Sequence, residues 1–245
     1  MNNKVLLNGK INVCQLIQTI QGEGRFVGYP VILIRVYGCN LNCPFCDTKQ
    51  LMYDDDITKS FTPYELSQVV NCVINKTGIE HLLITGGEPL LYKSQLIEFL
   101  DCCDTRIVEI ETNGTLLTNK YIETLFFGLK NKSIKIYFNI SPKSGNLSDY
   151  VFDPYSSSIS FTYKLVIDVN KIDKEITRIE KASRLYYGWP IYIMPMTTSS
   201  ETVDTLIEKM RKLEPVARKC NVALSNRLHL MLYGHDSSET QISYL

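Results

Sequence analysis

The sequence predicts an α/β fold, a partial (β/α)6-type TIM barrel that spans residues 1–245 as a single domain. Two observations carry this prediction. Short β-branched runs alternate with amphipathic helical patterns, which implies parallel βαβ units with right-handed crossovers. Polar motifs follow these runs, and ligands of such folds gather at the carboxyl ends of the strands. The sequence therefore predicts one ligand site at one end of a curved sheet.

The predicted elements follow one another with few interruptions. Apolar runs predict six strands, at residues 30–38, 81–87, 106–114, 134–143, 161–168 and 190–196. Amphipathic patterns predict five helices, at residues 62–78, 93–103, 119–129, 173–187 and 201–220. Thr62, Pro63 and Glu65 have the order of a capping box with proline in the first helical turn. Residues 144–160 are interpreted as a loop insertion in place of one helix, and 236–245 as a C-terminal tail.

Composition limits the classes of function. Hydrophobic residues make up 44% of the chain and charged residues 21%, values ordinary for a globular enzyme. Lys plus Arg and Asp plus Glu are both 26, so we expect no nucleic-acid or membrane partner on electrostatic grounds. No apolar run approaches the roughly 20 residues that span a bilayer. The N-terminal residues lack the pattern of a signal peptide, so we expect a cytoplasmic protein.

A cysteine cluster dominates the functional signal. Cys39, Cys43 and Cys46 lie in "GCNLNCPFCDTKQ" with the spacing Cys-x3-Cys-x2-Cys. In a cytoplasmic protein such a cluster indicates a metal or catalytic site rather than disulfides. A closed zinc site needs four ligands, and no fourth Cys or His lies nearby. A cubane iron–sulfur cluster normally takes four thiolates, so three would leave one iron open to a small molecule. The other five cysteines are expected to pack in the protein.

The cysteine motif resembles that of the radical S-adenosylmethionine (SAM) superfamily. "TGGEP" at 85–89 resembles the loop that binds the SAM amino group, where glycines allow a close backbone approach and a carboxylate accepts from an ammonium. The resemblance implies a 4Fe–4S cluster on the three cysteines, with SAM on the fourth iron. Met194 stands where relatives usually have Gln. The implied SAM-binding residues are Gly86, Gly87, Glu88, Thr112, Asn113, Ser141, Pro142, Lys143, Met194, Pro195 and Met196.

A finer resemblance covers nearly the whole chain and is strongest at residues 20–48, "IQGEGRFVGYPVILIRVYGCNLNCPFCDT". This stretch resembles the 7-carboxy-7-deazaguanine synthases of the queuosine pathway. The resemblance implies an Arg35 guanidinium that grips a substrate carboxylate, and a Thr48 hydroxyl, following Asp47, that ligates Mg2+. The remaining implied substrate-binding residues are Ile20, Gln21, Gly22, Glu23 and Thr85.

The implied reaction converts 6-carboxy-5,6,7,8-tetrahydropterin to 7-carboxy-7-deazaguanine with loss of ammonia, through a 5′-deoxyadenosyl radical. The implied partners are the pterin, a flavodoxin or ferredoxin as electron donor, and a second copy of the chain. Two alternatives stay open. A glycyl-radical-enzyme activating enzyme would share the cysteines but act on a protein, without need of Arg35 or Thr48. A non-catalytic metal-binding module would hold zinc, or no metal, and would not bind SAM.

Overall fold

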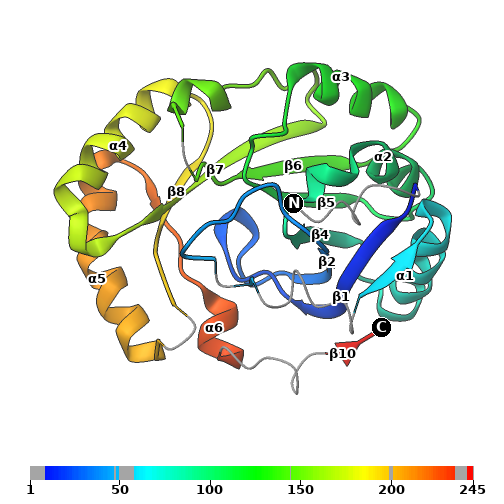
Figure 1. Cartoon of the computed structure of the whole chain (residues 1–245), viewed down its shortest axis with the longest axis horizontal. Helices are drawn as coiled ribbons and strands as arrows, with labels where there is room; N and C mark the ends of the chain where they lie inside the picture. Colours follow the sequence, from blue (N-terminus) through cyan, green and yellow to red (C-terminus); the bar gives the residue numbers. More distant parts are fainter. Residues whose placement is uncertain are drawn as a thin grey trace.

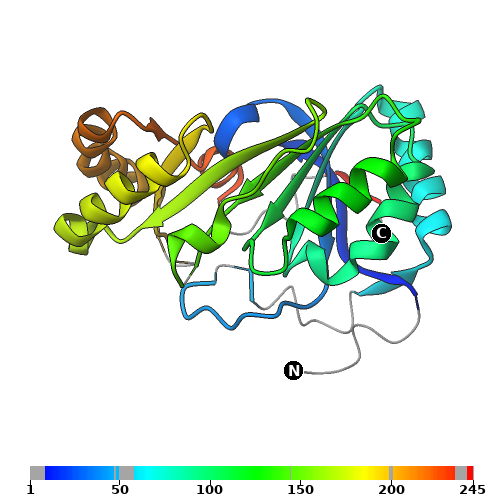
Figure 2. The ribbon, with the colours of Figure 1, turned by 90° about the horizontal axis from the view of Figure 1, so that it is seen from above.

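The computed structural model describes residues 9–46, 48–49, 58–143, 145–198, 201–234 and 242–244. Its centre is a curved sheet whose strands follow the order β10-β1-β2-β4-β5-β6-β7-β8-β9, with β3 also paired to β1. Helices line the outside of the curve (Figure 1). Figure 2 shows the same sheet from above, with α4 and α5 at one end of the curve and α1 at the other.

The six predicted strands are confirmed as a continuous parallel series. They are β2 (Pro30–Val36), β4 (His81–Gly86), β5 (Ile107–Thr112), β6 (Lys135–Ile140), β7 (Ile159–Ile167) and β8 (Ile191–Pro195). Adjacent members of this series pair in parallel throughout. Buried branched and aromatic side chains from these strands pack against the surrounding helices to form the main core. The partial barrel fold is therefore present as expected.

The five predicted helices also form, with shifted ends. They are α1 (Pro63–Thr77), α2 (Lys93–Asp101), α3 (Asn119–Gly128), α4 (Ile172–Leu185) and α5 (Val203–Cys220). The capping box of α1 is complete, because Glu65 N donates to the Thr62 hydroxyl at 3.2 Å and Thr62 N donates to the Glu65 carboxylate at 2.8 Å. None of the described helices is long and apolar enough to cross a membrane.

One long strand was not predicted. β1 (Ile11–Ile20) runs antiparallel to β2. Its polar residues Asn12, Gln15 and Gln18 recur every third position, a spacing that does not match a strand's period of two. The register with β2 shifts between Val13 and Gln15. This irregularity explains the step from Asn12 to Gln15, because a β-bulge interrupts the alternation of side chains between the two faces. From Gln15 onward the pairing is regular, so Gln15 and Gln18 lie on opposite faces, and only Gln15 lines the cavity described below.

The C-terminal part of the chain crosses the open side of the barrel. β9 (Ala223–Leu224) forms one edge of the sheet, and α6 (Leu228–Tyr233) follows it. β10 (Ile242–Ser243) then pairs with β1 at the opposite edge (Figure 1). The remainder of the predicted tail, apart from Tyr244, lies outside the described residues. Between β6 and β7 the described residues form a single-turn 3-10 helix (Leu147–Tyr150) and irregular chain.

Candidate active site

A cavity of about 350 Å3 opens at the carboxyl ends of the parallel strands. Because those ends meet at one edge of the sheet, motifs far apart in sequence line the same space. All but two of the predicted site residues line it. The exceptions are Glu88, which is fully buried beneath the cavity, and Pro142, whose carbonyl accepts from Arg178. Asp47 lies outside the described residues.

The cysteine loop leaves β2 through Gly38, which has a positive φ of 82°. Cys39, Cys43 and Cys46 all line the cavity, are only partly buried and form no disulfide. Within the described part of the chain, no three His, Cys, Asp or Glu side chains converge on a single metal ion. A 4Fe–4S cluster does not need such convergence, since each thiolate binds a different iron. Three reduced cysteines on one short loop therefore fit a cluster.

Electrostatics also fit a cationic occupant at the loop. Burial raises the pKa of the Cys39 thiol, and the nearby Glu88, Cys43 and Cys46 raise it further, while the Leu41 amide opposes them. The Leu41 amide donates to the Cys39 sulfur at 3.4 Å. Thiolates packed this closely repel one another unless positive charge lies between them. Bound iron would supply that positive charge, and it would also deprotonate the coordinating thiols.

The Gly-Gly-Glu-Pro loop packs directly under the cysteine loop. The amide of Gly87 donates to the Val36 carbonyl at 3.1 Å, and that of Glu88 to the Gly38 carbonyl at 2.9 Å. A Cβ atom on Gly87 would overlap the Gly38 carbonyl oxygen, and one on Gly86 would overlap the Val36 backbone. The two glycines are thus required for this backbone contact, whatever ligand the loop also approaches.

Glu88 has its carboxylate already engaged by the protein. It accepts from Leu90 N at 3.0 Å, Thr112 Oγ1 at 2.7 Å and Asn113 N at 2.8 Å. Burial raises its pKa, and these three donors together with the charge of Lys143 oppose the rise. In this structure Glu88 therefore anchors the loop after β5, and it offers no surface to the cavity.

The loops after β5, β6 and β8 complete the mouth. Asn113 donates to Asn40 at 2.9 Å, which links the loop after β5 to the cysteine loop. After β6, the Lys143 ammonium donates to Ser141 Oγ at 2.8 Å and lines the cavity. The thioether residues Met194 and Met196, with Pro195 between them, add an apolar wall at the end of β8.

Arg35 and Thr85 lie side by side on paired strands. They occupy matching positions in the register of β2 and β4, and both line the cavity. The Arg35 Nε donates to Gln15 Oε1 at 3.2 Å, so β1 orients the guanidinium. Thr48 also lines the cavity, with its hydroxyl 3.8 Å from the Cys46 sulfur. The structure thus brings a cation, two hydroxyls and the cysteine loop to one mouth.

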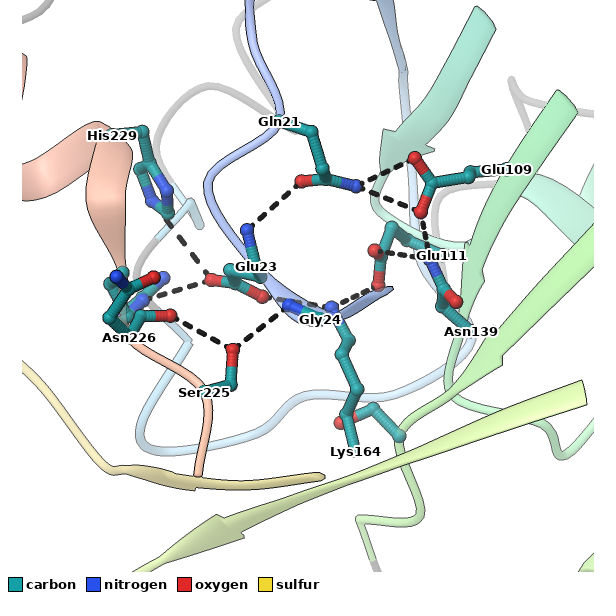
Figure 3. Close-up of polar contacts among 12 residues, drawn as sticks. Gln21, Glu23, Gly24, Glu109, Glu111, Asn139, Lys164, Ser225, Asn226 and His229 are labelled. Carbon is teal, nitrogen blue, oxygen red and sulfur yellow. Dashed lines mark hydrogen bonds and ion pairs between the residues drawn. The ribbon is translucent and has the colours of Figure 1, made fainter. Parts of the chain in front are cut away.

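The residues Gln21, Glu23, Glu109, Glu111, Asn139 and Lys164, which we call the floor network, form the deep end of the site (Figure 3). Glu109 is fully buried. It accepts from Gln21 Nε2 at 3.0 Å, from Asn139 Nδ2 at 2.7 Å and from His81 Nε2 at 2.9 Å. The Gln21 side chain therefore ties the loop after β1 to β5.

Lys164 links two carboxylates in the floor network. Its Nζ lies 2.8 Å from Glu23 Oε2 and also pairs with Glu111 Oε2. The other Glu23 oxygen pairs with Arg227 Nε at 3.0 Å. Burial alone would raise the pKa of Glu23, but the charges of Lys164, Arg227 and His229 hold it well below its usual value. Glu23 is therefore an ionised anchor of its loop.

The segment before α6 and α6 itself pack tightly on the loop after β1. Leu228 N donates to the Gly22 carbonyl at 2.9 Å. Gly24 N donates to Ser225 Oγ at 2.9 Å (Figure 3). A side chain on Gly22 would overlap His229, which lines the cavity. A glycine is therefore required here by packing, in addition to any contact with substrate.

Sequence reasoning missed several charged residues of this site, namely Glu109, Glu111, Lys164, Arg227 and His229. One signal was available for the first two. Glu109 and Glu111 occupy alternate positions of an otherwise apolar strand, so they share one face. Buried charges are rare unless they are paired or bind a ligand. Two acidic residues on the inner face of a predicted barrel strand therefore indicated partners inside the barrel.

Comparisons with known proteins agree with the motifs. Residues 33–206 match the model of the Radical SAM superfamily. The 7-carboxy-7-deazaguanine synthase of Rickettsia prowazekii is 30% identical, over 91% of this chain and 88% of that protein. The enzyme of that name from Pyrobaculum aerophilum is 27% identical, over 92% and 96% respectively.

A solved structure shows the same fold. The crystal structure of QueE from Escherichia coli has a TM-score of 0.59 and 20% sequence identity, and it aligns with 91% of this chain and 96% of that one. Given the superfamily match and the relative of 30% identity, the chain belongs to the radical SAM superfamily and, within it, to the 7-carboxy-7-deazaguanine synthase family.

Proposed function

We propose that the chain converts 6-carboxy-5,6,7,8-tetrahydropterin to 7-carboxy-7-deazaguanine and ammonia. The observation that carries the proposal is a single cavity with two chemically different ends. The cysteine loop, Arg35 and Lys143 lie at the mouth, and Glu23 and Glu111 of the floor network line the deep end (Figure 3). A carboxylated pterin is anionic at one end and carries N–H donors at the other. The charges of the cavity match that arrangement.

Substrate binding uses residues from opposite walls. Arg35 binds the substrate carboxylate through two N–H groups. Glu111, which lines the cavity, accepts from the 2-amino group and the neighbouring ring N–H of the pterin. Thr85, beside Arg35, supplies a hydroxyl to the ring, and the backbone of Ile20, Gln21 and Gly22 covers its edge. The substrate is thereby oriented before chemistry begins.

Cofactor binding uses the mouth. Cys39, Cys43 and Cys46 hold the 4Fe–4S cluster, and Lys143 binds the SAM carboxylate. The Met194–Met196 segment packs on the adenine and excludes water. When bound, the reduced cluster and SAM supply a radical that removes a hydrogen atom from the substrate. Thr48, which lines the cavity, would hold a Mg2+ ion that offsets the charge of the substrate carboxylate.

The wider assignments belong to the same proposal. The chain works as one domain in the cytoplasm, as a homodimer, with a flavodoxin or ferredoxin as electron donor. It binds neither nucleic acid nor membrane. The glycyl-radical alternative is not favoured, because the relatives are named as deazaguanine synthases and the Arg35–Thr85 pair gives the cavity a small-molecule anion site.

One anaerobic assay tests the function. The cluster is reconstituted, dithionite, SAM, Mg2+ and carboxytetrahydropterin are added, and products are followed by mass spectrometry. We expect 7-carboxy-7-deazaguanine and ammonia in equal amounts, with SAM consumed far more slowly than product forms. Cleavage of SAM with the pterin left intact would contradict the proposed substrate. Omission of Mg2+ tests the proposed role of Thr48.

A further inference from the structure

Lys164 is a buried cation that no sequence motif marks. Its side chain is 4% exposed, and it extends from β7 toward Glu23 and Glu111 (Figure 3). The two carboxylates come from different elements, Glu23 from the loop after β1 and Glu111 from β5. Lys164 therefore joins three separate parts of the barrel at the deep end of the cavity.

The two carboxylates depend on Lys164 to different degrees. Glu23 has a second cation close by, since Arg227 pairs with its other oxygen at 3.0 Å, and the His229 imidazole lies 4.0 Å away. The other oxygen of Glu111 instead accepts from the neutral Asn139 amide at 3.0 Å. Among the contacts seen in the described residues, Lys164 is the one cation on Glu111. The charge of Glu111 therefore rests mainly on Lys164.

The surroundings of Glu111 otherwise favour its protonated form. Burial raises the pKa of Glu111, Lys164 lowers it, and the neighbouring Glu23 and Glu109 raise it further. The remaining groups around the network are His81 and Asn139 on Glu109, and Arg227 and His229 on Glu23. The pKa of Glu111 is raised overall. Loss of Lys164 would raise it further and favour the protonated form, in which one acceptor oxygen becomes a donor.

We propose that Lys164 is a positioning residue, which keeps Glu111 ionised and aimed at the amino edge of the bound pterin. The inference rests on the proposed function. A carboxylate has about four lone-pair sites. Among the described residues, Asn139 and Lys164 use one site on each oxygen of Glu111, so two sites can accept from a ligand. An ionised acceptor pair matches the adjacent N–H donors of a 2-aminopterin. A pteridine without the 2-amino group would leave one acceptor unpaired.

The test measures pterin binding to reconstituted protein with SAM but without reductant, so that no turnover occurs. The variants are Lys164→Met, Glu111→Gln and their combination. Lys174→Met, on the exposed surface of α4, is the matched control. We expect Lys164→Met to weaken carboxytetrahydropterin binding by about 10-fold or more at neutral pH. SAM affinity and the binding of the control should match those of the unmodified protein.

Two further readouts separate positioning from a merely structural role. The weakening in Lys164→Met should diminish as pH rises, because Glu111 regains its charge by losing a proton. The double variant should bind pterin no more weakly than Glu111→Gln alone, since Lys164 acts through Glu111. This second comparison holds even if Lys164→Met alone does not fold. The inference would be overturned if the losses of pterin affinity in the two single variants added in full in the double variant. It would also be overturned if the loss in Lys164→Met did not change with pH.

The proposed function and this inference can fail separately. Product formation by the unmodified protein tests the function alone. If product forms and Lys164→Met binds the pterin as tightly as Lys174→Met, the inference is wrong and the function stands. If the unmodified protein forms no product from carboxytetrahydropterin, the function fails, and the same binding series shows whether the pocket recognises the pterin at all.

Discussion

The cysteine loop and the floor network lie in the same cavity, yet the protein holds them in different ways. The cysteine sulfurs make weak polar contacts, at 3.4 Å from the Leu41 amide to Cys39 and at 3.8 Å between Cys46 and Thr48. In the floor network, buried carboxyl groups accept from amide and ammonium donors at 2.7 to 3.0 Å. The first region presents side chains to a ligand, and the second engages most of its polar atoms with one another.

The difference indicates which part of the site also contributes to the stability of the fold. Charge-assisted hydrogen bonds in a low-dielectric interior are strong, and losing one partner is costly. The floor network is therefore part of the fold as well as of the pocket. The cysteines are partly exposed, so changing them should affect chemistry and leave folding almost intact. Four predictions test this contrast, beginning with the largest effect.

Cys43→Ala should abolish turnover and leave the fold intact. Loss of one of three cluster ligands should reduce product formation by about 1000-fold or more, equivalent to roughly 4 kcal/mol. The free energy of unfolding of the metal-free protein should change by less than about 0.5 kcal/mol, because Cys43 is partly exposed. Iron content, the anaerobic assay and urea unfolding check the three parts. If Cys43→Ala kept substantial turnover, or if its metal-free form were strongly destabilised, the cysteine loop would not differ from the floor network in the way described.

Glu109→Leu should show the reverse pattern at the floor. The substitution leaves the donors of Gln21, His81 and Asn139 buried without their acceptor. We expect a loss of about 3 kcal/mol in the free energy of unfolding, measured by urea titration of the metal-free protein. Glu98→Leu, on the exposed face of α2, is the matched control. Equal midpoints for the two variants would contradict the structural role of Glu109.

Acid should weaken the floor network through Glu23. Its folded-state pKa lies below the usual value, so its contribution to stability is present above about pH 4.5 and is lost as pH falls below that value. At neutral pH, Glu23→Gln should be less stable than the unmodified protein by about 2 kcal/mol. The difference should shrink as unfolding is repeated at lower pH. A constant difference down to pH 3 would show that charge is not the cause.

The smallest change in unfolding free energy is expected for a residue outside both regions, and it serves as a reference for the other three predictions. Thr62→Ala removes the side-chain cap of α1 and should cost about 1 kcal/mol of unfolding free energy. Thr62→Ser, which keeps the hydroxyl, should cost much less. Both variants should retain full turnover, because α1 contributes no lining residue to the cavity. Reduced turnover in either would show that fold and site are coupled more widely than the contacts indicate.

Local patterns in the sequence were sufficient for most of the fold. The six parallel strands and five helices depend on short-range periodicity. Nearly all of the predicted site residues line the cavity, although many further lining residues were not predicted. β1 was missed because a register shift disturbs its alternation of polar and apolar residues. α6 was not predicted, because six residues are too few to show a helical period.

The floor network could not be read from the sequence for a different reason. Lys164 and Glu23 are 141 positions apart, and their pairing depends on how the loop after β1 folds into the barrel. Gln21 was predicted as a substrate contact, yet its side chain amide is bound to Glu109. The contacts that a side chain makes in the folded protein determine whether it can still bind a ligand. Residue type alone does not reveal those contacts.

The C-terminal strand has a consequence for self-association. A barrel that does not close leaves two strand edges, and exposed edges invite pairing with other molecules. Along β1, β3 pairs with Ile11–Val13 and β10 with Ile17 and Gln18, and Tyr244 N adds a bond to the Leu16 carbonyl. At the opposite end β9 is only two residues long. The barrel thus remains open to its ligands while its described edges offer little template for aggregation.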